Sequence, residues 1–329
     1  TIDRHLSVLA SDDFMGRKPF TEGEEKTIHY LESELKGMGL KPGNGDSYFQ
    51  EVPLVEITGT QSPTMTVTGQ GKSMSFETSN DVVIYTERVE EEVAVKDSEL
   101  VYAGFGIVAP EYGWNDYDGL DVKGKTVVVL VNDPGFGSGD STLFKGDQMT
   151  YYGRWTYKYE EAARQGAAGV LIVHETIPAG YPWLVVQSSW TGAKLNLDDA
   201  NPPYKCAIQG WITRNTAVQL FQAAGIKDYS SLAKTKEFKP VAMGLKASMG
   251  VKNNIKRDMS HNVVAMVEGS KRPDEYVIYS AHWDHLGVGA PVDGDSIYNG
   301  AHDNASGTVG LLTIAETFAK METKPERSV

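Results

Sequence analysis

The sequence has almost no cysteine, no long apolar run and no excess of basic residues. Its single cysteine, Cys206, excludes an intrachain disulfide and a thiolate zinc cluster, and we expect it to be a small buried apolar residue. No run of eighteen apolar residues occurs, which excludes a membrane-spanning helix. The net charge of -13 disfavours binding to nucleic acid or to an anionic membrane surface, because both need clustered Lys and Arg.

The chain does have enough apolar material for two ordinary domains. Its 329 residues are 40% hydrophobic and 10% aromatic, which predicts packed cores. The sequence begins at Thr1 without an initiator Met, and a removed signal peptide or an engineered start would each explain this. A removed signal peptide predicts a periplasmic or extracellular location.

The N-terminal and middle regions predict a helix followed by a change of domain. Apolar residues recur at helical spacing from Ile28 to Met38, and Thr21 and Glu24 have the spacing of a capping box. From Thr58 the composition shifts to Thr, Ser, Gly and Val, which indicates a domain boundary. Further on, the sequence predicts a strand, a crossover helix and a strand at 126–131, 158–165 and 169–173.

The C-terminal region predicts an α/β arrangement. We interpret 253–258 as a polar linker, 262–267 and 276–281 as strands, 304–321 as an amphipathic helix, and 327–329 as the opening of another strand. His282 therefore follows the carboxyl end of a buried strand, where open α/β sheets place their ligands.

Three residues near this strand end suit a metal site. On an extended backbone His282 and Asp284 point the same way, so that Asp284 can accept the second ring N–H of His282. Asp303 precedes a helix start, where backbone N–H groups favour an anion. Alone, a His-x-Asp pair is usually a surface pair and Asp303 is most simply a helix N-cap. Their order and placement together favour a metal, whereas His285 and His302 are expected to be loop or structural residues.

The stretch 276–318 resembles the first metal-binding half of the M28 family of two-zinc aminopeptidases. The matching motifs are AHWDHLG at 281–287 and YNGAHDNASG at 298–307. Residues 6–17 resemble the N-terminal segment of bacterial members. Residues 158–175 resemble the protease-associated (PA) domain that is often inserted into such enzymes.

The resemblance implies an α/β fold with an inserted domain. A zinc-peptidase (phosphorylase/hydrolase-like) mixed-sheet domain, incomplete at its C-terminus, is expected at 1–57 and 246–329, and a mostly β PA domain at 58–245. It also implies that His282 ligates one Zn²⁺, that Asp303 bridges two zinc ions through a cis Asp303–Asn304 peptide, and that Asp284 supports catalysis through His282. Family members continue with a Glu-Glu pair, an Asp and a His, which would follow Val329 here. The chain is therefore expected to hold part of the site, with its activity in isolation left open.

The function implied by the resemblance is a metal-dependent aminopeptidase. It would hydrolyse N-terminal bonds of peptide substrates with a water activated by two zinc ions. Two alternatives stay open, a peptidase-like binding protein without activity and a one-zinc acyl-transfer enzyme of the cyclase type. We also expect an unpaired sheet edge, through which the chain aggregates or binds the missing C-terminal part of the peptidase domain.

Overall fold

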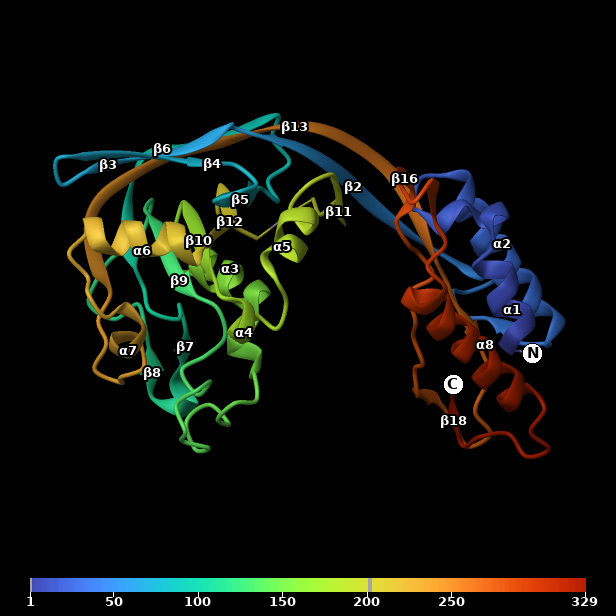
Figure 1. Cartoon of the computed structure of the whole chain (residues 1–329). Helices are drawn as coiled ribbons and strands as arrows, with labels where there is room; N and C mark the ends of the chain where they lie inside the picture. The colour runs from blue at the N-terminus through green and yellow to red at the C-terminus, as the bar shows by residue number, and fades with distance from the viewer. Residues whose placement is uncertain (1, 201–202) are drawn as a thin grey trace. The chain divides into compact units, whose positions relative to one another are not determined.

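The computed structural model describes residues 2–200 and 203–329 and contains two compact units (Figure 1). The first unit consists of the residues up to Leu54 together with Arg257–Val329, and the second consists of Val55–Lys256. The predicted inserted domain, 58–245, lies inside the second unit, and its assignment as a PA domain stays a prediction.

Two long strands carry the chain between the units. β2 (Phe49–Gln61) leads from the first unit into the second, and β13 (Val241–Val263) leads back. β13 runs through residues 253–258, so the polar linker predicted there is wrong. Asn253 donates its backbone N–H to the Glu91 carbonyl oxygen at 2.8 Å, a contact across 162 positions that composition does not reveal.

The second unit is built on a mixed sheet that has ten strands among the described residues. Besides β2 and β13, these are β3 (Thr64–Gly69), β4 (Lys72–Glu77), β5 (Val82–Tyr85), β6 (Glu92–Tyr102), β9 (Thr126–Leu130), β10 (Gly169–His174), β11 (Ala193–Leu197) and β12 (Ile208–Thr213). Their order is β11, β2, β13, β6, β9, β10, β12, β5, and β3 and β4 extend the sheet from β13. A separate ladder pairs β7 (Val108–Ala109) with β8 (Trp114–Asn115).

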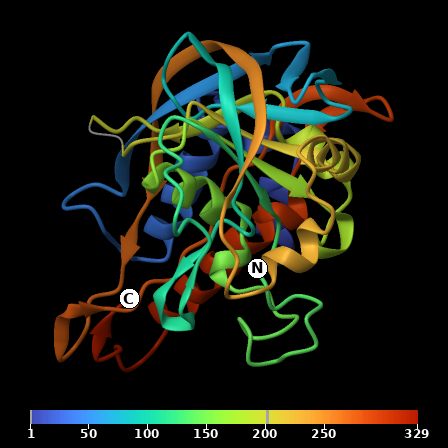
Figure 2. The same ribbon diagram turned by 90° about the vertical axis from the view of Figure 1, so that its left-hand side faces the viewer.

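The helices of the second unit cover both faces of the sheet. They are α3 (Trp155–Arg164), α4 (Thr176–Ala179), α5 (Trp183–Ser189), α6 (Arg214–Ala223) and α7 (Tyr229–Ala233), with 3₁₀ turns at Pro110–Tyr112 and Tyr151–Gly153. α3 and α5 share a core with Val127 and Val129, whereas α6 packs with Val128 and Leu130 on the other face. Figure 2 shows α6, in yellow, apart from α3, in green. Coverage of both faces explains why every residue of β9 is buried and apolar or hydroxylic.

The predicted strand–helix–strand unit is confirmed as β9, α3 and β10, whose strands pair in parallel. The α/β fold class with a mixed sheet is confirmed with it, since β6, β9, β10 and β12 are parallel and β13 and β5 pair antiparallel beside them. The mixed sheet belongs to the second unit, however. The described part of the first unit contains two-stranded ladders.

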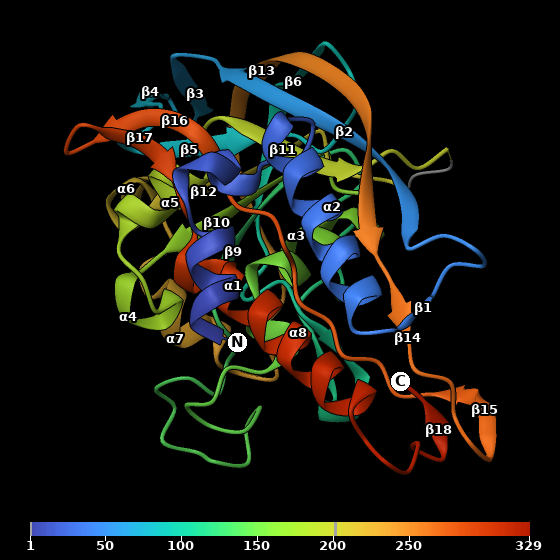
Figure 3. The same cartoon turned by 90° about the vertical axis from the view of Figure 1, so that its right-hand side faces the viewer.

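The first unit combines three helices with short ladders (Figure 3). The helices are α1 (Ile2–Leu9), α2 (Glu22–Gly37) and α8 (Ser306–Ala319), with a 3₁₀ segment at Asp12–Arg17 and a π-turn at Ala301–Ala305. The ladders pair β1 (Lys41–Pro42) with β14 (Ala265–Met266), β15 (Arg272–Tyr276) with β18 (Arg327–Ser328), and β16 (Gly287–Val292) with β17 (Asp295–Tyr298). None of the helices in the described ranges is long and apolar enough to cross a membrane.

The helix predicted at 21–38 is confirmed as α2, but its predicted capping box is wrong. The Thr21 hydroxyl donates to the Lys18 carbonyl oxygen at 2.6 Å and does not cap the helix. The Glu24 carboxylate accepts from the Phe20 backbone N–H at 2.7 Å and from the Ser260 hydroxyl at 2.8 Å. Glu24 therefore ties the helix start to β13, a role that its local spacing does not indicate.

The strand predicted at 276–281 is wrong in position. The strand is β15, and residues 277–286 have no regular secondary structure. Val277 donates its backbone N–H to the Ser328 carbonyl oxygen at 2.9 Å, and the pairing with β18 extends no further along this segment. A strand needs a hydrogen-bonded neighbour along its length, and residues 278–281 belong to none of the ladders of the described residues. The strand opening predicted at 327–329 is confirmed as β18.

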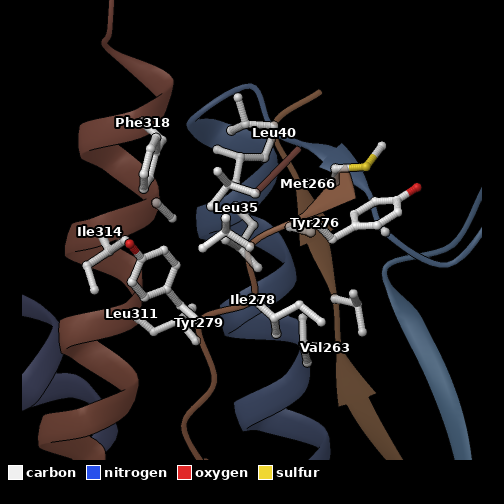
Figure 4. Close-up of a pocket in the computed structure, with 17 residues that line it drawn as sticks. Leu35, Leu40, Val263, Met266, Tyr276, Ile278, Tyr279, Leu311, Ile314 and Phe318 are labelled. Atoms are coloured by element: carbon white, nitrogen blue, oxygen red, sulfur yellow. The ribbon is translucent and has the colours of Figure 1, made fainter. Parts of the chain in front are cut away.

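An apolar groove lies in the first unit between α2, α8 and the chain around β14 and β15 (Figure 4). Its volume is about 300 Å³, and its walls include Leu35, Val263, Leu311 and Phe318. Ile278 lines the groove and is 83% exposed. Contiguous exposed apolar surface of this kind favours association.

We therefore expect Ile278→Lys to reduce self-association of this chain, because a charge in the groove opposes burial of the groove against another molecule. Light scattering across a concentration series measures the effect. The matched control is Ile177→Lys on α4, since Ile177 is 79% exposed but belongs to the second unit. A chain that is monomeric with and without the groove substitution would contradict the prediction.

Candidate metal centre

His282 and Asp284 lie on the irregular segment that follows β15, and they point the same way. The Nδ1 atom of His282 is 3.2 Å from an Asp284 carboxylate oxygen. Trp283, between them, points to the other side, where its ring packs in the core with α2 and its Nε1–H donates to the His261 carbonyl oxygen at 3.1 Å. The alternation that the sequence predicts for these three residues is thus present.

The other ring nitrogen of His282 faces Asp303. Its Nε2 atom lies 3.2 Å from an Asp303 carboxylate oxygen, so the structure brings all three predicted residues together. Asp303 lies in the π-turn before α8, and its peptide bond to Asn304 is cis, as the resemblance implies. The helix begins at Ser306 and not at Asn304, so Asp303 is three residues before the first helical residue.

Side chains from α8 and the turn before it hold the backbone of His282. The Thr308 hydroxyl donates to the His282 carbonyl oxygen at 3.0 Å, and the Asn304 amide donates to the same oxygen at 3.4 Å. Asn304 also accepts the Gly307 backbone N–H at 3.2 Å. A Cβ atom on Gly307 would lie 2.4 Å from the Asn304 Oδ1 atom, so this small residue makes room for Asn304. No local pattern indicates the contact that Thr308 makes.

The donor atoms at this centre suit zinc. Imidazole nitrogen and carboxylate oxygen are both ordinary zinc ligands, and two such donors on one tetrahedral ion lie about 3.3 Å apart. The observed separation of 3.2 Å between His282 and Asp303 agrees with that value. Both side chains are open to solvent, with 55% and 70% of their surfaces exposed. Among the described residues, no three His, Cys, Asp or Glu side chains are placed so that they could hold one metal ion together. His282 and Asp303 therefore form a partial donor set.

The two neighbouring histidines are placed differently. His285 is half-buried, and burial lowers the pKa of its imidazole. Its backbone N–H donates to the Arg17 carbonyl oxygen at 3.3 Å, which agrees with its predicted place as a loop residue. His302 is exposed, and its carbonyl oxygen accepts the Ser306 hydroxyl at 2.8 Å.

Arg17 is the residue at this centre that our sequence reasoning missed. It is buried, and its guanidinium donates to the carbonyl oxygens of Trp283, Asn299 and Gly300 on the two segments that carry the predicted ligands. It lies in the N-terminal segment that shows the family resemblance, but nothing in its local pattern indicates these contacts.

The structure is that of an α/β protein with a histidine–carboxylate cluster just before the start of α8. Residues 262–329, which include the cluster, match the model of peptidase family M28. No curated protein matches the chain.

Several solved structures are similar to the chain. An aminopeptidase from Aneurinibacillus sp. strain AM-1 is 18% identical with a TM-score of 0.47, over 99% of this chain and 60% of that one. BSAP, a zinc aminopeptidase from Bacillus subtilis, is 16% identical with a TM-score of 0.40, over 99% and 59%. A peptidase M28 precursor from Shewanella amazonensis SB2B is 15% identical with a TM-score of 0.39, over 100% and 66%. The chain thus spans about three fifths of the length of the first two structures.

Proposed function

We propose that the protein containing this chain is a metal-dependent aminopeptidase that hydrolyses N-terminal bonds of peptides. The observation that supports it most is that His282 Nε2 lies 3.2 Å from an Asp303 carboxylate oxygen, inside the segment that matches the model of the peptidase family. The periplasmic or extracellular location remains a prediction.

In this proposal His282 and Asp303 would hold zinc. Bound zinc supplies a Lewis acid and lowers the pKa of a water toward neutrality. The Nδ1–H of His282 is directed at Asp284, whose backbone carbonyl oxygen and one carboxylate oxygen each lie 3.2 Å from Nδ1. This fixes the tautomer with a free lone pair on Nε2 and makes that nitrogen a better donor. The open face of the pair leaves room for a peptide carbonyl, and the general base of the reaction is not assigned to a residue of this chain.

The test is zinc-dependent hydrolysis of a leucyl anilide by the full protein. We expect a chelator to abolish activity, Zn²⁺ to restore it, and His282→Ala to lower both zinc content and rate. His29→Ala is the control, because His29 is an exposed residue of α2 in the same unit. Unchanged activity and zinc content in His282→Ala would sink the assignment.

Zinc content also separates the proposal from its alternatives. Two zinc ions per chain with anilide hydrolysis support the aminopeptidase. One ion without hydrolysis favours acyl-transfer chemistry, and peptide binding without zinc favours a binding protein.

A further inference from the structure

Arg17 is a buried cation that joins three segments of the first unit. Its side chain is 1% exposed. Nε donates to the Trp283 carbonyl oxygen at 2.8 Å, Nη1 to that of Asn299 at 2.6 Å and Nη2 to that of Gly300 at 2.8 Å. Nη1 also donates to the Leu9 carbonyl oxygen at the end of α1. One guanidinium therefore links a helix to both segments that carry the candidate ligands.

The positions of these carbonyls in the chain are informative. Trp283 lies between His282 and Asp284, and Gly300 is three residues before Asp303. The main chain of Arg17 adds a further bond to the first of these segments, through the backbone N–H of His285. The contacts thus flank the histidine–carboxylate pair on both sides without touching its donor atoms.

The backbone that presents Arg17 is strained. Met15, Gly16 and Arg17 have φ values of 49°, 65° and 50°, so three consecutive residues are left-handed. For a non-glycine residue this conformation is unfavourable, and such strain persists only where the surroundings enforce it. A Cβ atom on Gly16 would lie 2.5 Å from the Tyr298 carbonyl oxygen and 2.6 Å from that of Gly287. The turn is therefore pressed against the β16–β17 hairpin, between the two ligand-bearing segments.

The positive charge of Arg17 interacts with carboxylates of the candidate metal centre. Burial lowers the pKa of the guanidinium, and the negative charges of Asp284 and Asp303 oppose this change. Lysine could not replace Arg17, because a single ammonium nitrogen cannot donate to carbonyl oxygens that lie in different directions around a planar guanidinium.

We propose that Arg17 is a positioning residue that clamps the segments 283–285 and 299–300 and thereby sets His282 opposite Asp303. This inference rests on the proposed function only where it predicts an effect of Arg17 on zinc affinity. The clamp itself is a statement about the metal-free protein, so the two can fail separately.

The clamp is tested by hydrogen exchange in the metal-free protein, comparing Arg17→Lys with wild type. We expect amides of 282–287 and 298–305 to exchange about tenfold faster, while those of the second unit are unchanged. The control is Arg4→Lys, since Arg4 is exposed on α1 and pairs with Glu34 at 2.8 Å away from the centre. Unchanged exchange of both segments in Arg17→Lys overturns the proposal, whatever the protein does with zinc.

The effect of the clamp on metal binding is measured as zinc affinity and by the visible spectrum of the Co²⁺-substituted protein. We expect Arg17→Lys to weaken zinc binding about 10- to 100-fold and to alter the Co²⁺ spectrum, as loss of an outer support does. Wild-type affinity with an unaltered spectrum would overturn the role in positioning. If wild type binds no zinc, the proposed function fails and hydrogen exchange alone decides the clamp.

A second variant covers the case in which Arg17→Lys does not fold by circular dichroism. Gly300→Ala places a Cβ atom 2.7 Å from Arg17 Nη2 and 2.4 Å from the His285 ring, so it displaces the guanidinium but keeps its charge. We expect the same faster exchange of the two segments, and wild-type exchange in this variant would count against the clamp.

Discussion

Replacing Asp303 with asparagine is expected to lower kcat/KM for a leucyl anilide more than replacing Asp284 does. A neutral amide has one oxygen and no charge, so Asp303→Asn removes the negative charge and one donor oxygen of a side chain that would contact zinc directly. Asp284 acts only through Nδ1 of His282, 3.2 Å away, and loss of such an outer partner costs about 10- to 100-fold. The loss for Asp303→Asn is expected to exceed this range, with a matching fall in zinc content.

The control for this pair is Asp293→Asn, an exposed position in the β16–β17 turn with φ 52°, which asparagine adopts readily. It is expected to leave kcat/KM and zinc content unchanged. Equal losses for Asp303→Asn and Asp284→Asn would contradict the assigned difference in roles. No loss in either variant would contradict the assignment of a metal centre to these residues.

The largest stability effect is expected for Asp116→Ala in the second unit. The Asp116 carboxylate is buried and accepts three donors, the backbone N–H groups of Phe105 and Ile107 at 3.1 and 3.0 Å and the Trp114 Nε1–H at 2.8 Å. Burial raises its pKa to about 7. The nearby Lys158 ammonium is also buried, and its pKa is lowered by burial and raised by Asp116.

Alanine at this position leaves all three donors without their acceptor and removes the charge that supports Lys158. Each buried donor left unpaired costs about 1–3 kcal/mol, so we expect the three lost contacts to destabilise the protein by at least about 3 kcal/mol. Urea unfolding followed by tryptophan fluorescence measures it. Asp118→Ala is the control, since Asp118 is exposed in an ion pair with Lys239 and is expected to change stability by about 0–1 kcal/mol. Similar losses for the two variants would refute the account.

Elements with strong local patterns could be predicted from the sequence. The apolar run of β9, the crossover helix α3 and the amphipathic helix α2 carry their period or their burial in their own residues. The elements that were predicted wrongly depend on partners that lie far away in the sequence. Residues 253–258 are polar yet belong to β13, and the apolar run after Val277 has no ladder because β18 ends beside it.

The same distinction applies to the candidate centre. His282, Asp284 and Asp303 lie in short motifs, so chemistry and spacing were enough to select them. Arg17 was not selected, because its bond to Trp283 spans 266 positions and its acceptors are backbone carbonyl oxygens. Any residue presents such an oxygen, so no side-chain pattern records the contact.

The pairing of β2 with β13 bears on how such a chain could arise. In the first unit the Tyr48 carbonyl oxygen accepts the Val264 N–H at 2.7 Å, and in the second the Gly250 carbonyl oxygen accepts the Ser62 N–H at 2.8 Å. The points where the chain leaves and rejoins the first unit are thus neighbours on adjacent strands. A tight two-residue turn could join them. The intervening 202 residues, Val55–Lys256, can therefore be gained or lost in a single genetic event without rerouting the rest of the polypeptide.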